Sequence, residues 1–543
     1  MYKFLTFFAF VFIVHFSFAQ KTTSTQTAGI ARPKLVVGIV VDQMRWDYLY
    51  RYYDVYKSNG GFKRMLGEGF TCENTFIPYT PTVTAAGHTC VYTGSVPAVH
   101  GIVGNDWYDN ILKKDMYCAQ DDSVQTVGST TDAGKMSPKN MLTTTIGDEI
   151  KLATNFKSKV IGIAIKDRGA ILPAGHAANA AYWYDSKTGD FITSTYYMND
   201  LPAWVKTFNG RKLVDSLYKL NWDLALPKDV YAKYCTADDK SYENKPLGKV
   251  TFPYDLSQYV GKEYGKISST PYGNTLTEAL AEAAVKAENL GRNGTTDMLT
   301  VSFSSTDYIG HAYGPNSYEQ FDDFVRLDET LGKFFAFLDA TVGKGEYTVF
   351  LTADHGAAHV PKFSIENKLP GGFTFNANLN SALKEKFGYD KLIIGTDNYM
   401  INFNNDLIDS AKLDKEDIHQ TVIYLLLKQK EVAQAFEVKE VMEIPLTQKQ
   451  REMVSNGYFP SRCGDIQIIL KPGYVPGSGN GTSHGLWNPY DSHIPLVWYG
   501  WGIKHGKTNR ETYMTDIAAT LAGMLRVQMP SGCVGHVIEE VMK

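Results

Sequence analysis

Hydrophobic positions in this chain form short continuous runs, and each run leads into a residue with catalytic or metal-binding chemistry. KLVVGIVV precedes Asp42, VIGIAI precedes Lys166, DMLTVSFSST precedes Asp307, and YTVFLTA precedes Asp354 and His355. These runs are rich in β-branched residues and lack polar alternation, which predicts strands buried on both faces, as in a parallel sheet.

Between the predicted strands, hydrophobic residues recur every three or four positions, for example along SYEQFDDFVRLDETLGKFFAFLDATVG at residues 317–343. This spacing predicts amphipathic helices. Strands that alternate with helices indicate an α/β fold with a mostly parallel central sheet flanked by helices. In such sheets ligands bind at the carboxyl ends of the strands, where the polar residues named above fall.

Two stretches fit this alternation poorly and are interpreted as insertions that wall or cap the site. Residues 180–270 are rich in Tyr, Trp, Asp and Lys with little regular period, and residues 357–482 mix strand-like, helical and Gly-rich segments. Large α/β enzymes often carry such insertions in one core. We therefore expect one catalytic domain over residues 34–543.

The N-terminus has the three parts of a cleaved signal peptide. A basic Lys3 precedes an apolar stretch from Phe4 to Phe18, and Ala19 ends the segment. We expect cleavage after residue 19, a polar leader over residues 20–33, and export to the periplasm or the extracellular space. The alternative is an N-terminal membrane anchor, but the short apolar region and its small-residue exit favour the cleaved form. No stable membrane anchor is therefore expected.

Composition narrows the class of protein. The 543 residues are 44% hydrophobic and 21% charged, which is typical of a folded globular chain. The formal net charge is only -4 and the basic residues are dispersed, so no nucleic-acid partner is expected. Six cysteines lack the paired spacing of a structural zinc site and are interpreted as structural. We expect a monomer that acts on small molecules.

Carboxylates and imidazoles at the predicted strand ends are the ligand types of zinc and similar metals. Asp307 and His311 are four residues apart, so a helical turn would place both side chains on one face. Each residue alone has an ordinary structural explanation, such as a helix cap. The hypothesis of a metal site rests on their joint placement at the strand ends. The candidate ligands are Asp42, Asp307, His311, Asp354, His355 and His484.

A Thr-rich segment, TPTVTAAGHTCVYTG, predicts a helix that begins near residues 82–84. A hydroxyl at that position faces free amide groups and the positive end of the helix dipole, conditions that favour an alkoxide and a bound phosphate. The alternative is an ordinary N-cap. Residue chemistry alone does not choose among Thr80, Thr82 and Thr84.

Several separated motifs resemble one known family. PTVTAAGH followed by TGSVPAVHGIVGN resembles the nucleophile segment of the alkaline phosphatase superfamily, in particular its nucleotide pyrophosphatase/phosphodiesterase branch and the PafA-type alkaline phosphatases. IKDRGAILPAGH, TDYIGHAYGP, TADHG and GTSHG follow in the expected order. The resemblance implies an alkaline-phosphatase-like core.

The resemblance also implies roles for individual residues. Thr84 would be the nucleophile and would form a phosphothreonine, and Asn105 would hydrogen-bond a phosphoryl oxygen. Two zinc ions would stabilise the attacking and leaving oxygens. One zinc would be held by Asp42, Thr84, Asp354 and His355, and the other by Asp307, His311 and His484.

Lys166 and Arg168 bear on the substrate. If the VIGIAI strand continued past its apolar run, these two residues would project to the same side. Two cations can meet the extra negative charge that a phosphate monoester carries over a diester. KDR resembles the PafA-type enzymes, in which the equivalent Lys and Arg contact the phosphoryl group. The alternative is that Lys166 and Arg168 are two unrelated surface charges. With the resemblance, the sequence favours a phosphate-binding pair and therefore a secreted phosphomonoesterase.

Other functions remain as alternatives. A phosphodiesterase or nucleotide pyrophosphatase on the same scaffold is the nearest one. A relative of the cofactor-independent phosphoglycerate mutases would use manganese and serine, and an exported binding protein would lack hydrolysis. A sulfatase is excluded because Tyr92 and Gly94 stand where the signature around Cys90 requires proline and arginine.

Overall fold

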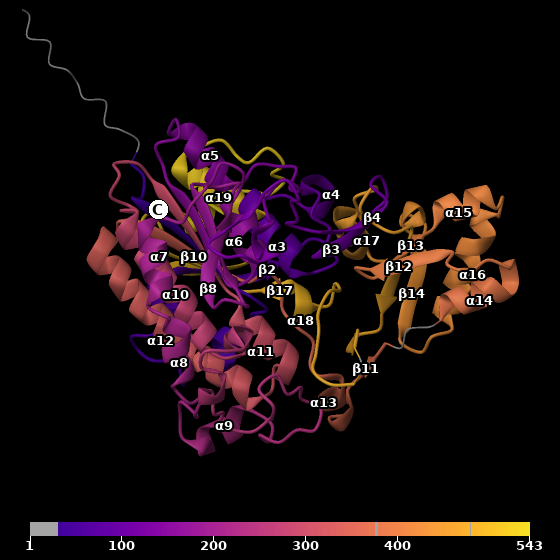
Figure 1. The fold of residues 1–543 in the computed structure, drawn as a ribbon, viewed down its shortest axis with the longest axis horizontal. Coiled ribbons are helices and arrows are strands. Elements are labelled where there is room, and N and C mark those ends of the chain that lie inside the picture. The colour runs from indigo at the N-terminus through magenta and orange to yellow at the C-terminus, as the bar shows by residue number, and fades with distance from the viewer. Residues whose placement is uncertain (1–30, 375–377, 478) are drawn as a thin grey trace, which may run out of the picture. The chain divides into compact units, whose positions relative to one another are not determined.

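An 11-stranded sheet lies at the centre of the computed structural model (Figure 1). Its five middle strands run parallel, in an order that departs from their order along the chain. They are β10 (Tyr347–Thr352), β1 (Leu35–Val41), β9 (Asp297–Phe303), β6 (Val160–Ala164) and β7 (Ala180–Asp185). Every residue of these strands is buried, which explains their continuous apolar sequences.

Antiparallel pairs extend this centre on both sides. Outward from β10 the order is β18 (Leu496–Gly500), β2 (Phe70–Phe76) and β17 (His493–Ile494), and β19 (Gly506–Tyr513) pairs with β2 in parallel. Beyond β7 lie β8 (Asp190–Ser194) and β5 (Thr126–Val127). The predicted α/β class and the four predicted core strands are confirmed.

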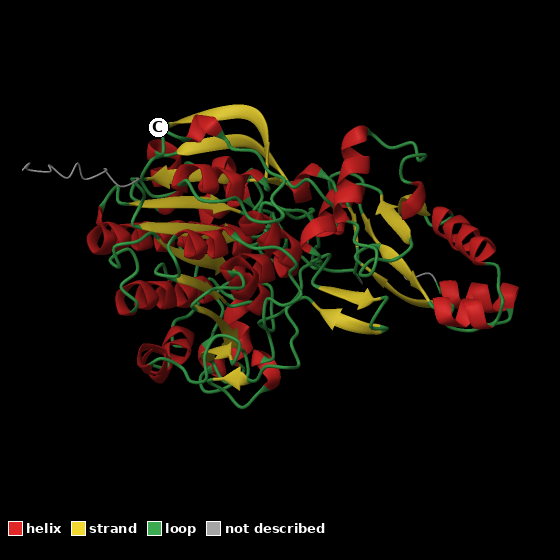
Figure 2. Ribbon diagram, turned by 90° about the horizontal axis from the view of Figure 1, so that it is seen from above, coloured by secondary structure: helices red, strands yellow, loops and turns green. Residues whose placement is uncertain are grey.

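Helices cover the sheet. On one side lie α10 (Tyr272–Ala287) and α12 (Tyr318–Leu338), and on the other lie α3 (Thr84–Thr93), α6 (Asp167–Ala174) and α19 (Asp516–Leu525) (Figure 1). Figure 2 shows helices in red among the yellow strands of the sheet. The buried residues of α12 include Phe321, Phe324, Leu331 and Phe335, at the three- and four-residue spacing that predicted this helix.

The stretch from 180 to 270 is only partly an insertion. Its first two strands, β7 and β8, belong to the central sheet, so the prediction is wrong for residues 180–194. The apolar run of β7, AAYWY, is short and lies in a stretch rich in Tyr, Trp, Asp and Lys, so the sequence pattern did not indicate a strand there. After this point the chain forms α7 (Ala203–Gly210), α8 (Leu213–Tyr218) and α9 (Lys228–Tyr234), which pack near α10 and α12.

Part of the stretch from 357 to 482 forms a separate four-stranded antiparallel sheet, here called the accessory sheet. Its strands are β12 (Ile393–Asp397), β13 (Met400–Phe403), β15 (Ile466–Leu470) and β14 (Val432–Glu437), in that order. The helices α14 (Leu379–Phe387), α15 (Asn405–Ser410) and α16 (Lys415–Leu427) accompany it (Figure 1). A two-residue turn, Asn398–Tyr399, joins β12 to β13 with positive φ at both residues.

The structure describes residues 31–374, 378–477 and 479–543, and the elements named above belong to one compact unit, Pro33–Lys543. The predicted signal peptide, residues 1–19, and most of the leader lie outside the described residues. Among the described helices, none combines the length and apolarity needed to cross a membrane. All six cysteines carry free thiols, and four of them are buried.

Gly87 lets α3 pack directly on the end of β10. A Cβ at this position would lie 2.4 Å from the carbonyl oxygen of Asp354 and 2.7 Å from its Cβ. We expect Gly87→Ala to lower the free energy of unfolding by about 1–3 kcal/mol through overpacking, although alanine has the higher helix propensity. Urea unfolding measures the change.

The matched control is Gly67→Ala in α2 (Gly61–Glu68). Gly67 is exposed, and a Cβ there would meet nothing within 4 Å. This substitution should raise the free energy of unfolding by about 0.5–1 kcal/mol, because only helix propensity changes. A gain of stability in both variants would show that α3 does not depend on this close approach.

Candidate metal centre and active site

Three carboxylates gather where β1, β9 and β10 end. Asp42 follows β1, Asp307 lies in the first turn of α11 (Ser305–Tyr313) after β9, and Asp354 follows β10. Their exposed fractions are 0%, 4% and 0%. Because the strands are parallel neighbours, their carboxyl ends converge, and the predicted concentration of polar groups at this edge of the sheet is observed.

Lys166 lies between two of these carboxylates. Its Nζ donates to Asp42 Oδ2 and to Asp307 Oδ2, each at 2.6 Å. The expectation that Lys166 continues a strand is wrong, because β6 ends at Ala164 and Lys166 is the N-cap of α6. The lysine therefore reaches the carboxylates from the start of a helix, and Arg168 belongs to the first turn of that helix.

Electrostatics at this edge of the sheet favour a bound cation. Burial, reinforced by the charges of Asp307 and Asp354, raises the pKa of Asp42 well above its usual range despite the nearby lysine. Burial lowers the pKa of Lys166, but Asp307 and Asp42 outweigh it and the net shift is upward. Three acids thus share a small buried volume with one ammonium group, and additional positive charge would stabilise their ionised forms.

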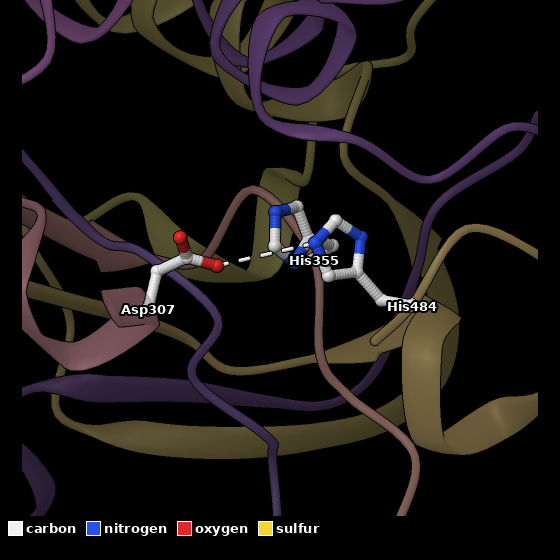
Figure 3. A group of neighbouring side chains, drawn as sticks. All are labelled: Asp307, His355 and His484. Atoms are coloured by element: carbon white, nitrogen blue, oxygen red, sulfur yellow. Dashed lines mark ion pairs between the residues drawn. The ribbon is translucent and has the colours of Figure 1, made fainter. Parts of the chain in front are cut away.

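Two histidines complete two overlapping groups of possible metal ligands. His355 Nε2 lies 3.6 Å from Asp42 Oδ1 and 3.4 Å from Asp354 Oδ2, which forms the first group. The second contains Asp307, His355 and His484, with His484 Nε2 3.9 Å from Asp307 Oδ1 (Figure 3). The two imidazole rings stack at 3.5 Å. His355 is shared, so the two groups are adjacent.

His311 lies next to the second group. Its Nε2 is 3.2 Å from Asp307 Oδ1, and its Nδ1 donates to the carbonyl oxygen of Thr482 at 2.8 Å. Burial lowers the pKa of His311, but the Asp307 carboxylate outweighs it and raises that pKa. The predicted one-face arrangement of Asp307 and His311 on a helical turn is observed in α11.

The residues present fit a pair of divalent cations. Within the described chain, Asp42 Oδ1 and Asp354 Oδ2 are buried oxygens without a hydrogen-bond partner. His355 and His484 donate through Nδ1 to backbone carbonyls of Gly356 and Thr82, at 3.0 and 2.7 Å, which leaves each Nε2 lone pair available. Metal-ligating histidines use this tautomer, and the donor set of carboxylates and imidazoles suits zinc.

The structure separates the three threonines that sequence chemistry left equivalent. Thr80 and Thr82 donate their hydroxyls to the carbonyl oxygens of Gly485 and Leu486, each at 3.2 Å. Thr84 is the first residue of α3, with Val83 as its N-cap, and its Oγ1 lies 3.4 Å from His355 Nε2. Only this hydroxyl of the three faces the ligand groups, and none of them caps α3.

Two predicted phosphate-binding residues lie near the start of α3 and of α6. Asn105 Oδ1 accepts from the amide of Ala85 at 3.0 Å, which fixes its carboxamide beside Thr84. Arg168 Nη1 donates to the hydroxyl of Tyr117 at 3.1 Å, and its buried Nε has no partner among the described residues. The Tyr117 hydroxyl in turn donates to Asp167.

Gln43 and His88 support the ligand groups, and neither is among the candidate residues predicted from the sequence. Gln43 has φ of 64°, and it donates through its backbone amide to Asp354 Oδ1 and through Nε2 to Asp307 Oδ1 at 3.1 and 2.7 Å. His88 lies 2.9 Å from the carbonyl oxygen of Thr84 and 3.3 Å from Asp354 Oδ2. Only the four-residue spacing between Thr84 and His88 could have signalled that contact.

Two other histidines, His100 and His493, have structural contacts away from the ligand groups. His100 is buried and accepts from the amide of Ile102, and its burial lowers its pKa to about 3. His493 stacks on Trp46 and Phe76. Neither belongs to a ligand group in the described structure.

Comparison with known proteins assigns this geometry to a class. Residues 36–494 match the model of the type I phosphodiesterase / nucleotide pyrophosphatase family. The chain is 51% identical to alkaline phosphatase PhoV of Synechococcus elongatus over 519 residues, which covers 95% of this chain and 94% of the relative. It is 48% identical to alkaline phosphatase PafA of Elizabethkingia meningoseptica over 532 residues, covering 96% of each.

Solved structures agree with these matches. The crystal structure of wild-type PafA has a TM-score of 0.93 and 48% identity, and covers 95% of this chain and 100% of that chain. A PafA variant with one threonine, one asparagine, one lysine and one arginine replaced has the same TM-score at 47% identity, with the same two coverages. The fold and the site therefore define a phosphate-ester hydrolase scaffold of the alkaline phosphatase superfamily. Within it, the chain belongs to the type I phosphodiesterase / nucleotide pyrophosphatase family, in the PafA-type group of alkaline phosphatases.

We expect the purified protein to hold two divalent ions per chain, and chelation to lower its thermal midpoint. Restoring zinc at 100 times its dissociation constant should return about 2.7 kcal/mol of stability for each site. Asp354→Asn and His484→Ala should each reduce metal content and the zinc-dependent shift, measured by elemental analysis and thermal unfolding.

Glu416→Gln is the matched control, since Glu416, Glu437 and Glu440 also lie within metal-binding distance of one another but Glu416 is exposed. It should leave both quantities unchanged. Full metal content in Asp354→Asn and His484→Ala alike would contradict the assignment.

Proposed function

We propose that the protein is an exported, zinc-dependent alkaline phosphatase that hydrolyses phosphate monoesters through a phosphothreonine at Thr84. The observation that carries the proposal is the position of the Thr84 hydroxyl. It lies at the start of α3 and 3.4 Å from His355, the residue shared by both ligand groups. Two relatives at about half identity over nearly the whole chain, PhoV and PafA, are named as alkaline phosphatases, which supports the same activity.

Each residue of the site has a role in this reaction. Thr84 Oγ1 attacks phosphorus, the ester oxygen leaves with the organic group, and water later releases inorganic phosphate and restores the hydroxyl. Asn105 directs its amide nitrogen at a phosphoryl oxygen, because its Oδ1 is already held by the amide of Ala85. The helix dipole of α3 favours the negative charge that collects there.

Zinc would be held by Asp42, Thr84, Asp354 and His355 at one position and by Asp307, His311 and His484 at the other. When bound, it supplies a Lewis acid that lowers the pKa of a hydroxyl or water and stabilises charge on the leaving oxygen. Gln43 and His88 hold Asp307, Asp354 and the Thr84 backbone in place for this purpose.

Lys166 and Arg168 support a monoester substrate. Lys166 reaches two of the candidate metal ligands, and Arg168 lies in the first turn of the same helix. A monoester dianion would gain more from two such cations than a diester monoanion does. In the PafA variant, the four replaced residue types follow the order threonine, asparagine, lysine and arginine. Thr84, Asn105, Lys166 and Arg168 follow the same order in this chain.

Export to the periplasm or extracellular space rests on the signal-peptide pattern of residues 1–19. A monomer that acts on small phosphate esters, without nucleic-acid or membrane partners, is consistent with the charge pattern of the chain. The alternative function is a phosphodiesterase on the same scaffold, which the family model also includes in its name.

Thr84→Ala should reduce phosphate release from an aryl phosphate by about 1,000-fold or more, because the attacking oxygen is lost. Thr84→Ser should retain part of the activity. Thr82→Ala is the control, since its hydroxyl bonds only to the Leu486 carbonyl, and it should remain active.

Mass spectrometry of the acid-quenched parent should find phosphate on residue 84 and Gln20 as the first residue of the exported protein. Activity in Thr84→Ala at the parent's level would reject this nucleophile.

Arg168→Ala should lower kcat/KM for an aryl phosphate monoester by about 10- to 100-fold through loss of charged hydrogen bonds. For the matching diester the change should stay below about threefold, since that substrate carries less negative charge. Arg510→Ala removes an exposed arginine paired with Glu540 and serves as the control. Equal losses on both esters, or a parent that prefers the diester, would favour the phosphodiesterase instead.

A further inference from the structure

A large cavity adjoins the candidate active site. It has a volume of about 710 Å³, and Asn105, His311 and His484 form part of its wall. The facing part of the wall comes from the accessory sheet, including Ile394 and Thr396 on β12. The cavity therefore lies between the candidate active site and the accessory sheet. The strands of that sheet contain none of the candidate metal ligands.

The chemistry of the cavity wall differs from that of the phosphate position. Its lining combines apolar side chains of the accessory sheet, such as those of Ile394, Ile401 and Ile468, with about as many polar groups, which are mostly amides and hydroxyls such as those of Asn398 and Thr396. Glu431 is the one carboxylate among the described lining residues, and these include no lysine and no arginine. Such a wall favours an uncharged group that presents both apolar surface and hydrogen-bonding atoms, and it disfavours an anion because it offers no lysine or arginine.

The accessory sheet is fastened to the active site at one turn. Asn398 Nδ2 donates to the carbonyl oxygen of Asp106, next to Asn105, at 2.8 Å. The hydroxyl of Tyr399 donates to the carbonyl oxygen of His484, also at 2.8 Å. These bonds tie the turn between β12 and β13 to both the phosphate-binding asparagine and a candidate metal ligand. The two hydrogen bonds thus fix the position of this part of the cavity wall relative to Asn105 and His484.

We propose that this cavity binds the organic leaving group and selects phosphate monoesters of uncharged, partly apolar alcohols over those of small or anionic alcohols. The inference rests on the proposed phosphatase function. In an in-line displacement the departing alcohol lies opposite the attacking oxygen. The groups that would meet it beyond Thr84 are those of His311 and His484, and both line the cavity. A phosphate alone would occupy only a small part of this volume.

Ile394 offers a direct test, because its side chain is 41% exposed and lines the cavity. The probes are ethyl phosphate, hexyl phosphate and hexyl phosphate with a terminal carboxylate. The two alkyl esters release alcohols of similar acidity, so their chemical steps are matched. We expect kcat/KM to be about tenfold or more higher for hexyl than for ethyl phosphate, and to fall again by about tenfold when the carboxylate is added.

Ile394→Ala should lower kcat/KM for hexyl phosphate by about threefold to tenfold and change that for ethyl phosphate by less than about twofold. Leu427→Ala is the matched control, since Leu427 is 48% exposed at the end of α16 and outside the cavity lining. As a second measurement, hexan-1-ol should inhibit ethyl phosphate hydrolysis more strongly in the parent than in Ile394→Ala.

The outcomes separate this inference from the proposed function. Equal kcat/KM for the three esters in an active parent, or equal losses on ethyl and hexyl phosphate in Ile394→Ala, would overturn the leaving-group site and leave the phosphatase intact. Failure to hydrolyse any of the three esters, with metal bound, would overturn the proposed function itself.

Discussion

Burying three carboxylates at one edge of the sheet is the constraint on which the rest of this structure depends. Asp42, Asp307 and Asp354 lose their hydration there and repel one another, so their ionised forms require positive charge close by. Lys166 supplies one such charge at 2.6 Å from two of them, and Gln43 supplies hydrogen bonds to Asp307 and Asp354. The unpartnered oxygens of Asp42 and Asp354 show that this compensation is incomplete within the described chain, which is the condition that divalent cations satisfy.

The same constraint explains how the other reactive groups are held. His355 and His484 turn their Nε2 atoms toward the acids because their Nδ1 atoms donate to backbone carbonyls. Helix α3 approaches Asp354 so closely that only glycine fits at position 87, and this contact brings Thr84 to the ligand groups. Nucleophile, ligands and lysine therefore belong to one packed unit, and a small displacement of α3 would alter all of them.

Much of this arrangement could be predicted from the sequence because the relevant signals are local. The apolar runs that end at Asp42, Asp307 and Asp354 identified both the strands and their reactive edge. The choice of Thr84 among three threonines required a family resemblance, since the contacts that engage Thr80 and Thr82 come from a loop about 400 residues away in the chain.

Other features depended on contacts that no local pattern records. The apolar run VIGIAI extends up to Lys166, which predicted that this residue belongs to the strand. In the structure, helix α6 begins directly after Lys166. The role of Gln43 follows from a backbone turn with positive φ, which glutamine rarely adopts and which its sequence neighbours do not announce. The strands β7 and β8 were missed because their apolar runs are short and lie in a stretch rich in Tyr, Trp, Asp and Lys with no regular period.

The place at which the accessory sheet enters the chain has a consequence for divergence among related enzymes. The segment that forms the accessory sheet lies between β10 and β18 in the chain. These two strands are hydrogen-bonded neighbours in the central sheet, so the segment begins and ends at adjacent strands. Such a segment can lengthen, shorten or exchange side chains without shifting the strands that carry the acids. Substrate range and phosphoryl chemistry can therefore evolve as separate traits, coupled through contacts that include the two bonds made by the turn at Asn398 and Tyr399.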